Sequence, residues 1–262
     1  MSEVDPALSR AEREALAELA LRLGDDRLIL GHRLSEWCGH APVLEEELAL
    51  ANVALDCLGH ASTLLALAGE LEGRGRSADE LAFLRDAREF RNCLLVEQPN
   101  GDFAVTMVRQ LLFDQADLLF YEGLQASRHA GLAGFAARAV REIRYHVRHA
   151  RAWWLRLGDG TDESRRRMEA ALEELWRFTG ELFATDELER GLAAAGLAPD
   201  RAALASRWEE ALCAVAAGAR LRLPGAGPLH AGGGRRGIHG ESLGLLLAEM
   251  QVLARTHPGA SW

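Results

Sequence analysis

Two short segments of the chain combine an acidic residue and a histidine at helical spacing. They are Asp56-Cys57-Leu58-Gly59-His60 and Glu142-Ile143-Arg144-Tyr145-His146. Residues three or four apart share one face of an α-helix, so each acid converges with its histidine. Di-iron carboxylate sites in helical bundles use Glu-x-x-His on two helices and one further carboxylate from each of two others. Here Cys57 and Ile143 take the positions of the two ligating glutamates, which indicates a di-iron scaffold that has lost its metal.

The remaining ligands of such a site would be carboxylates on other helices. The candidates are Glu36 and either Asp114 or Asp117, and Glu36 could equally be a surface acid or part of an ion pair. One hypothesis is therefore a catalytic di-metal oxidase or oxygenase. It would use Glu36, Asp56, His60, Asp114, Glu142 and His146.

Two other interpretations of the histidine segments need no metal. A helical histidine is commonly a satisfied core or surface residue, with an acid four residues away as its partner. Alternatively, a carboxylate beside the ligating glutamate often orients a metal-site histidine, and Asp56 and Glu142 occupy that place. The segments would then form a vestigial polar network with no metal and no catalytic residue. Its members would be Glu36, Asp56, Cys57, His60, Asp114, Glu142, Ile143 and His146.

The composition favours a helical, soluble protein. The chain of 262 residues contains two tyrosines and is rich in alanine and leucine, which indicates one all-helical domain spanning residues 1–262. Its net charge of −9 argues against nucleic-acid binding. The polar N-terminus and the lack of an apolar run of about 20 residues predict a cytoplasmic protein without membrane contact. The four cysteines lack C-x-x-C spacing, so we expect buried thiols.

Capping residues and turn signals predict where the helices begin and end. Ser9 can cap a first helix, and Gly24-Asp25-Asp26 is expected to end it and start a second. Ser77 and Asp102 can cap the helices that begin after them. The pattern predicts four long core helices with shorter ones around them, and a Gly-rich loop at 224–240. The expected ranges are 10–23, 25–38, 43–71, 78–90, 103–127, 131–157, 161–183, 186–195, 200–221 and 241–255.

Several long, irregular strings resemble one protein family. The chain is similar, from about Leu21 to Trp262, to the C subunits of phenylacetyl-CoA 1,2-epoxidases. The resemblance is carried by Leu34-Ser35-Glu36-Trp37-Cys38-Gly39-His40-Ala41-Pro42, Leu94-Leu95-Val96-Glu97-Gln98-Pro99-Asn100-Gly101, Leu175-Trp176-Arg177-Phe178-Thr179 and Leu247-Ala248-Glu249-Met250-Gln251.

The resemblance implies an all-α, ferritin-like four-helix bundle that acts as a non-catalytic subunit. A homologous A subunit would hold the di-iron centre and carry Asp-Glu-x-x-His and Glu-Glu-x-x-His where this chain has Cys57 and Ile143. A reductase with FAD and an iron–sulfur cluster would deliver electrons from NADPH. The complex, which would also contain other epoxidase subunits, would use O2 to epoxidise phenylacetyl-CoA. This subunit would itself carry no cofactor, because such oxygen chemistry needs the partner's metal.

One segment could contact the coenzyme A ester. Arg85, Arg88 and Arg91 would line one face if the helix at 78–90 continues, and arginine suits phosphate binding. Adenine could stack on Phe90 and hydrogen-bond to Asn92. The alternative is a solvated face paired with nearby acids. The tentative ligand contacts are Arg88, Glu89, Phe90, Arg91 and Asn92.

The glycine-rich segment Gly232-Gly233-Gly234-Arg235-Arg236-Gly237 is the second candidate surface. Its backbone N–H groups and two cations precede a helix, which is typical of an anion cradle. A docking loop is the alternative. A third functional hypothesis follows, in which the chain is an adaptor that binds the coenzyme A ester.

Overall fold

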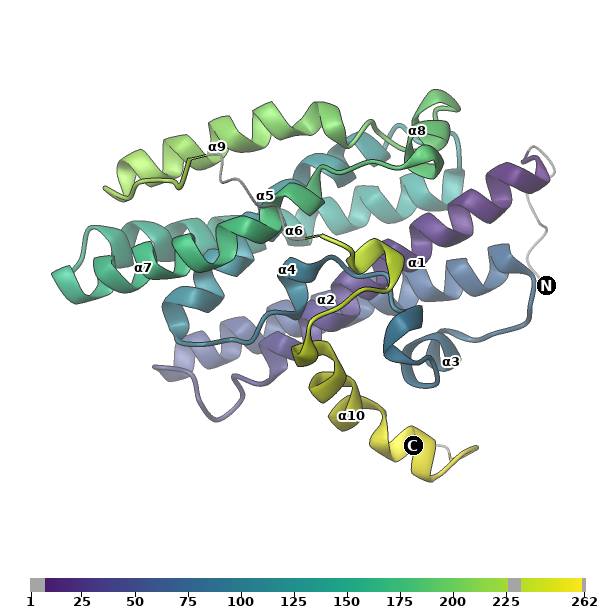
Figure 1. Ribbon diagram of the computed structural model, residues 1–262, viewed down its shortest axis with the longest axis horizontal. Helices are drawn as coiled ribbons and strands as arrows, with labels where there is room; N and C mark the ends of the chain where they lie inside the picture. The colour runs from purple at the N-terminus through teal and green to yellow at the C-terminus, as the bar shows by residue number, and fades with distance from the viewer. Residues whose placement is uncertain (1–7, 226–231, 261–262) are drawn as a thin grey trace. The chain divides into compact units, whose positions relative to one another are not determined.

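The computed structural model describes residues 8–225 and 232–260 and, within them, contains ten α-helices and no strand (Figure 1). The predicted all-α, ferritin-like class is confirmed. The chain divides into two compact units. Unit 1 comprises Met1–Pro99 and Gly233–Trp262, and unit 2 comprises Asn100–Gly232. The organisation as one domain stays a prediction.

Two long helices form the centre of unit 1. Helix α1 (Arg10–Ser35) packs along α2 (Leu44–Glu72), and the short connection between them makes the pair antiparallel. As predicted, α1 begins at a capping box in which Ser9 and Glu12 satisfy each other's backbone N–H groups. Helix α2 ends at Gly73, whose φ of 68° is typical of a glycine after a helix.

Helix α1 runs through Gly24 without interruption, so the predicted helix end at this residue is wrong. A Cβ at Gly24 would lie 2.9 Å from Leu65 Cδ2, and one at Gly31 would lie 3.2 Å from Cys57 Cβ. The two glycines are seven residues apart and therefore lie on one side of α1. They allow α1 to approach α2 closely, which is a packing requirement rather than a turn.

The rest of unit 1 is made of shorter segments. Helix α3 starts at the predicted Ser77 cap, but it ends at Phe83 and does not reach Phe90. A 3-10 turn and a one-turn helix follow, and the C-terminal part of the unit contains a second 3-10 turn and a last helix. The elements are α3 (Ala78–Phe83), η1 (Ala87–Glu89), α4 (Leu94–Glu97), η4 (Gly234–Arg236) and α10 (Glu241–Thr256).

Unit 2 is centred on a second antiparallel pair, α5 (Phe103–Leu124) and α6 (Ala130–Gly158). The predicted Asp102 cap is present, because its carboxylate accepts a hydrogen bond from the Val105 N–H at 3.1 Å. Two buried indoles donate to backbone carbonyls of α5, Trp154 to Met107 at 3.0 Å and Trp208 to Leu112 at 2.9 Å. The other elements are α7 (Asp162–Leu175), η2 (Trp176–Leu182), α8 (Glu187–Ala194), η3 (Ala202–Leu204) and α9 (Ala205–Gly218).

Helix α2 contains a long apolar stretch, although the sequence analysis predicted none of about 20 residues. Among the described helices it alone is long and apolar enough to cross a membrane, with a mean hydropathy of 1.4 over its most apolar window. Core helices of soluble proteins can have the same length and composition, so these properties are weak evidence for a membrane span. Only 44% of that window is buried. Much of the apolar surface of α2 therefore faces away from the unit it belongs to.

Candidate functional site

The first histidine segment lies on α2, and the position of its missing ligand faces a cation. Cys57 is fully buried. The fully buried Arg27 of α1 donates a hydrogen bond from Nη1 to Cys57 Sγ at 3.5 Å. A guanidinium at this distance would repel a metal cation. The contact therefore disfavours iron at this position.

The two acids that accompany this segment differ in exposure from His60. His60 is 5% exposed, whereas Asp56 is half-buried. Glu36 follows the last residue of α1 and accepts a hydrogen bond from Arg33 Nη1 at 2.7 Å, with its side chain 40% exposed. Glu36 is therefore an exposed acid that forms an ion pair, which agrees with both roles that the sequence left open besides ligation.

The second histidine segment lies on α6, and its buried carboxylate comes from α5. Ile143, His146 and Asp114 are all fully buried. The Asp114 carboxylate accepts a hydrogen bond from Gln110 Nε2 at 2.5 Å, and its Oδ1 lies 4.0 Å from His146 Nδ1. Glu142 is exposed. A buried carboxylate of α5, Asp114, therefore lies near His146. The orientation of the ring by Glu142 stays a prediction.

The donor set does not fit a di-iron centre. In the described parts of the chain, no group of three or more His, Cys, Asp or Glu side chains could hold a metal ion. The position of one expected ligand is the apolar, fully buried Ile143, and the other is Cys57 beside Arg27. The residues present offer a helical scaffold with histidines and carboxylates but without the two glutamates that would hold iron at positions 57 and 143. The vestigial network as a whole stays a prediction.

The predicted arginine stripe is wrong because its first member points inward. The Arg85 guanidinium lies 4.2 Å from the centroid of the Phe90 ring and bonds to the Asp25 carboxylate. Phe90 and Asn92 are fully buried, and Asn92 Nδ2 donates to Glu97 Oε2 at 2.9 Å. Helix α3 ends before Arg85, so the helical spacing on which the stripe rested does not exist.

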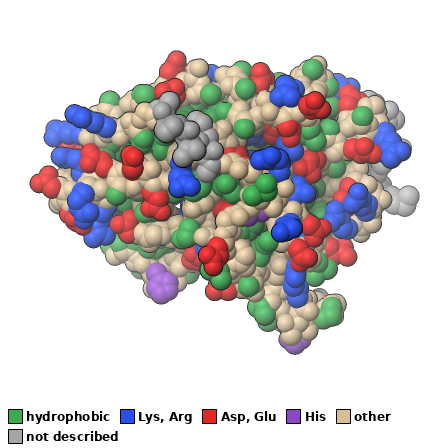
Figure 2. All heavy atoms as spheres, viewed as in Figure 1, with side chains coloured by type: hydrophobic (Ala, Val, Ile, Leu, Met, Phe, Trp, Pro, Cys, Tyr) green, Lys and Arg blue, Asp and Glu red, His purple; other side chains and the backbone are tan. Residues whose placement is uncertain are grey.

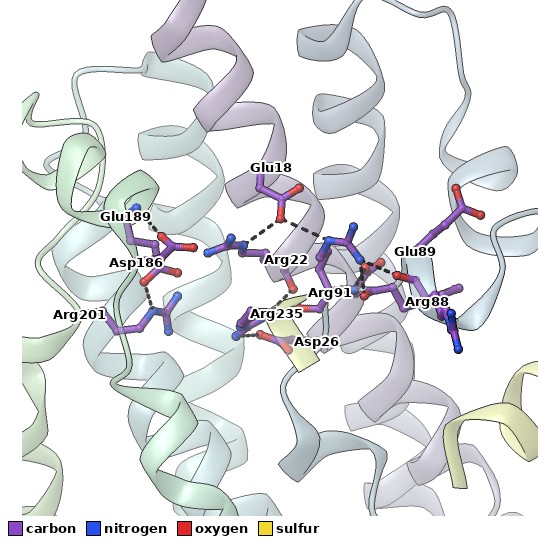
Figure 3. A network of polar contacts seen from close by, with 12 residues as sticks. Glu18, Arg22, Asp26, Arg88, Glu89, Arg91, Asp186, Glu189, Arg201 and Arg235 are labelled. Carbon is purple, nitrogen blue, oxygen red and sulfur yellow. Dashed lines mark hydrogen bonds and ion pairs between the residues drawn. The ribbon is translucent and has the colours of Figure 1, made fainter. Parts of the chain in front are cut away.

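The remaining members of the tentative ligand set lie nearer the surface. Arg88 and Glu89 are exposed, and Arg91 is half-buried. Arg91 donates from Nη1 to the carbonyls of Arg88 and Phe90, each at 2.9 Å (Figure 3). A ligand on this surface would therefore meet Arg88, Glu89 and the edge of Arg91, while Phe90 and Asn92 would need the segment to open. Contact with a coenzyme A ester stays a prediction.

Arg235 of the glycine-rich segment bonds to groups of unit 1. The predicted role of this cation in binding an anion is therefore wrong. Arg235 Nη2 donates to the Asp26 carboxylate at 2.6 Å, and Nη1 donates to the Arg91 carbonyl at 2.8 Å (Figure 3). A Cβ at Gly234 would lie 2.1 Å from the Asn92 carbonyl oxygen. Gly234 is required for close backbone packing. Residues 226–231 of the predicted loop lie outside the described residues.

Unit 2 has a polar cluster of its own. Arg201 Nε donates to Glu189 Oε2 at 3.2 Å, and both side chains are largely buried (Figure 3). Asp186 caps α8 by accepting from the Glu189 N–H at 2.9 Å.

On the face of the molecule drawn in Figure 2, arginines and acids are interspersed. This is not the continuous basic surface that a phosphate backbone needs.

The sequence analysis missed a buried pair of Glu97 and His239. The Glu97 carboxylate lies 2.8 Å from His239 Nδ1 and accepts the Gly240 N–H at 2.6 Å. The other ring nitrogen of His239 lies 3.0 Å from the Phe90 carbonyl. Because both ring nitrogens face acceptors, these contacts favour the doubly protonated imidazolium form of the ring. Burial by itself lowers the pKa of His239, but Glu97, the Phe90 carbonyl and the charge of Asp25 raise it above its ordinary value.

This pair predicts a pH dependence of stability. The pKa of His239 is raised in the folded state, so its stabilising contribution is complete below the ordinary pKa of 6.5 and is lost as the pH rises through the raised value. We expect the free energy of unfolding of the wild type to fall over that range, relative to His239→Gln. Urea denaturation at a series of pH values measures it. A difference between the two proteins that is constant with pH would contradict the charged pair.

Comparison with known proteins agrees with the family resemblance of the sequence strings. The chain matches the model of the family described as phenylacetic acid catabolic protein over residues 1–262. It is 48% identical, over 247 residues, to the C subunit of 1,2-phenylacetyl-CoA epoxidase from Escherichia coli (strain K12). The match covers 94% of this chain and 99% of the relative. The chain therefore belongs to the phenylacetic acid catabolic protein family.

Proposed function

We propose that this chain is a non-catalytic subunit of a 1,2-phenylacetyl-CoA epoxidase. The similar protein from Escherichia coli is a C subunit of such an enzyme, at 48% identity over nearly its full length. The observation that carries the non-catalytic role is the loss of the same ligand in both histidine segments. Cys57 lies beside the Arg27 guanidinium, and Ile143 is fully buried. Neither position supplies a carboxylate to a metal.

The chemistry would then take place in a homologous A subunit. Its di-iron centre would supply the oxygen activation, with electrons delivered from NADPH through the FAD and iron–sulfur cluster of a reductase. In the overall reaction one oxygen atom of O2 enters the aromatic ring as an epoxide. The other is reduced to water by two electrons from NADPH and two protons. The present chain would hold the complex together and stabilise its A subunit in the cytoplasm.

Two other hypotheses remain from the sequence. A catalytic di-metal subunit using Glu36, Asp56, His60, Asp114, Glu142 and His146 would have to draw on Glu142, which is exposed, and on Glu36, which pairs with Arg33. An adaptor for the coenzyme A ester would rely mainly on Arg88 and Arg91. The non-catalytic role explains why Cys57 and Ile143 replace the ligating glutamates, and the two other hypotheses do not.

Co-expression with an A subunit tests the proposal. We expect an affinity-tagged A subunit to retain the untagged chain through purification, and the complex with its reductase to epoxidise phenylacetyl-CoA. The chain purified alone should contain much less iron than the roughly two per chain of a working di-iron site. Iron is measured by plasma emission spectroscopy.

Two results would contradict the proposed function. One is a chain that stays monomeric in the presence of the A subunit. The other is a chain that binds about two irons and activates O2 alone, because it would then be catalytic. The A subunit expressed without the chain is the control, and we expect it to be less soluble and less active than the pair.

A further inference from the structure

Helix α2 carries an apolar stripe on its outer face that the fold of unit 1 does not use. The stripe has alternating spacings of four and three residues over most of the helix, which places its members along one line. Leu44, Leu48 and Leu55 are 67%, 57% and 66% exposed. The outward stripe of α2 is formed by the apolar Leu44, Leu48, Ala51, Leu55, Leu58 and Ala66, together with the small polar Ser62.

The fold already has its core on the opposite side of the same helix. The buried residues of that side include Leu50, Val53, Ala54, Cys57, Ala61, Leu64 and Leu65. These residues pack the helix into unit 1, where α1 is its principal neighbour. A surface helix normally has a polar outer face, and a contiguous apolar patch on such a face marks a surface that another molecule covers. The outward stripe therefore requires a second cover.

We infer that the outward stripe of α2 is the surface through which this chain docks on the partner subunit of the proposed function. The stripe runs for about 33 Å from Leu44 to Ala66 at 1.5 Å per residue. Pairs of leucines are separated or followed along it by the smaller Ala51, Ser62 and Ala66. Ridges of large side chains beside small ones are the pattern that accepts another helix. The occupant is an apolar helix of that subunit.

Charge excludes a second copy of this chain as the occupant. The charged residues of α2 are all acidic and lie mainly at its two ends: Glu45, Glu46, Glu47, Asp56, Glu70 and Glu72. A twofold pairing through this helix would set acids against acids, whether the two helices ran parallel or antiparallel. The fitting partner is a different chain, with arginine or lysine flanking its apolar helix.

The same charges exclude a lipid surface. Helices that lie on membranes carry lysine or arginine beside their apolar face, because membrane surfaces are negatively charged. The acidic residues of α2 would be repelled by such a surface. This leaves a cation-flanked helix of another protein subunit as the partner that the stripe fits.

The experiment compares two matched double variants in the complex with the A subunit. Leu48→Glu with Leu55→Glu places charges in the outward stripe. Leu245→Glu with Leu253→Glu makes the same change at two leucines of α10 that are 67% and 60% exposed. Because all four side chains are largely exposed, we expect both variants to keep the wild-type circular dichroism and melting temperature. The dissociation constant from the A subunit is then measured by biolayer interferometry.

We expect the stripe variant to bind the A subunit about 100-fold more weakly or worse, and the α10 variant to bind within about threefold of the wild type. Wild-type affinity in the stripe variant would overturn the docking surface and leave the proposed function standing. A wild type that does not bind would overturn both. Two further results would overturn the docking surface. One is a chain that forms dimers by itself, if the stripe variant breaks those dimers. The other is a chain that sediments with phosphatidylcholine–phosphatidylglycerol vesicles, if the stripe variant does not.

Discussion

Replacing Asp25 with alanine is expected to lower the free energy of unfolding by about 3–5 kcal/mol, which is the usual cost of removing one partner of a buried ion pair. The Asp25 carboxylate is fully buried and bonds to the Arg85 guanidinium, with Arg85 Nη1 at 3.0 Å. It also accepts the Arg91 N–H at 2.8 Å. Without Asp25, a guanidinium that is 3% exposed would remain buried against Phe90 without that counter-charge.

Urea denaturation followed by circular dichroism measures this loss. The control is Arg144→Gln, which removes one partner of the exposed Arg144–Glu122 ion pair and should leave the urea midpoint nearly unchanged. The urea midpoint of Asp25→Asn should lie between those of Asp25→Ala and Arg144→Gln, because an amide keeps the shape of the side chain and part of its hydrogen bonding. If Asp25→Ala were as stable as Arg144→Gln, the Asp25–Arg85 ion pair would not be the interaction that holds residues 85–91 against α1.

Restoring a glutamate at Ile143 is expected to cost even more stability and to bring in no iron. Burying an isoleucine contributes about 1.5–3 kcal/mol, which the substitution removes. The new carboxyl group would also lie in a site that is fully buried and would have to lose its hydration or its charge. We therefore expect Ile143→Glu to lower the free energy of unfolding by more than about 4 kcal/mol, which is at the upper end for single substitutions. Ile143→Val, expected to cost about 0.5–1.5 kcal/mol, is the matched control.

Cys57→Glu gives the contrasting case within the same motif. Cys57 Sγ already accepts a hydrogen bond from Arg27, so a carboxylate placed there would lie within reach of a guanidinium. We expect a smaller loss of stability than for Ile143→Glu. The double variant should show no rise in bound iron. Uptake of about two irons per chain would instead restore the hypothesis of a catalytic subunit.

The helix boundaries were largely predictable because caps act over three or four residues. Ser9, Ser77 and Asp102 each accept a backbone N–H of the first turn, as their sequence context predicted. The failure at Gly24 has a tertiary cause. Glycine there serves the approach of α2, and nothing within a few residues of it distinguishes close packing from a turn.

The polar pairs of unit 1 lie beyond the range of local patterns. Asp25 and Arg85 are 60 residues apart, Glu97 and His239 are 142 apart, and Asp26 and Arg235 are 209 apart. A sequence shows that such residues can ionise, but only the folded chain decides which of them meet. For this reason the local patterns predict ligand-binding roles for Arg85 and Arg235, whereas both are buried or partly buried partners of α1.

By itself the sequence determined the all-helical class, the caps, the family, and the absence of a ligating carboxylate at Cys57 and Ile143. These properties depend on residue identity and short spacing. The tertiary structure alone decided that Arg27 lies on Cys57, that Asp114 faces His146, and that Leu44 and Leu48 at the start of α2 point outward. Periodicity reports that residues share a face of a helix, whereas the packing of one helix against another decides which face is covered.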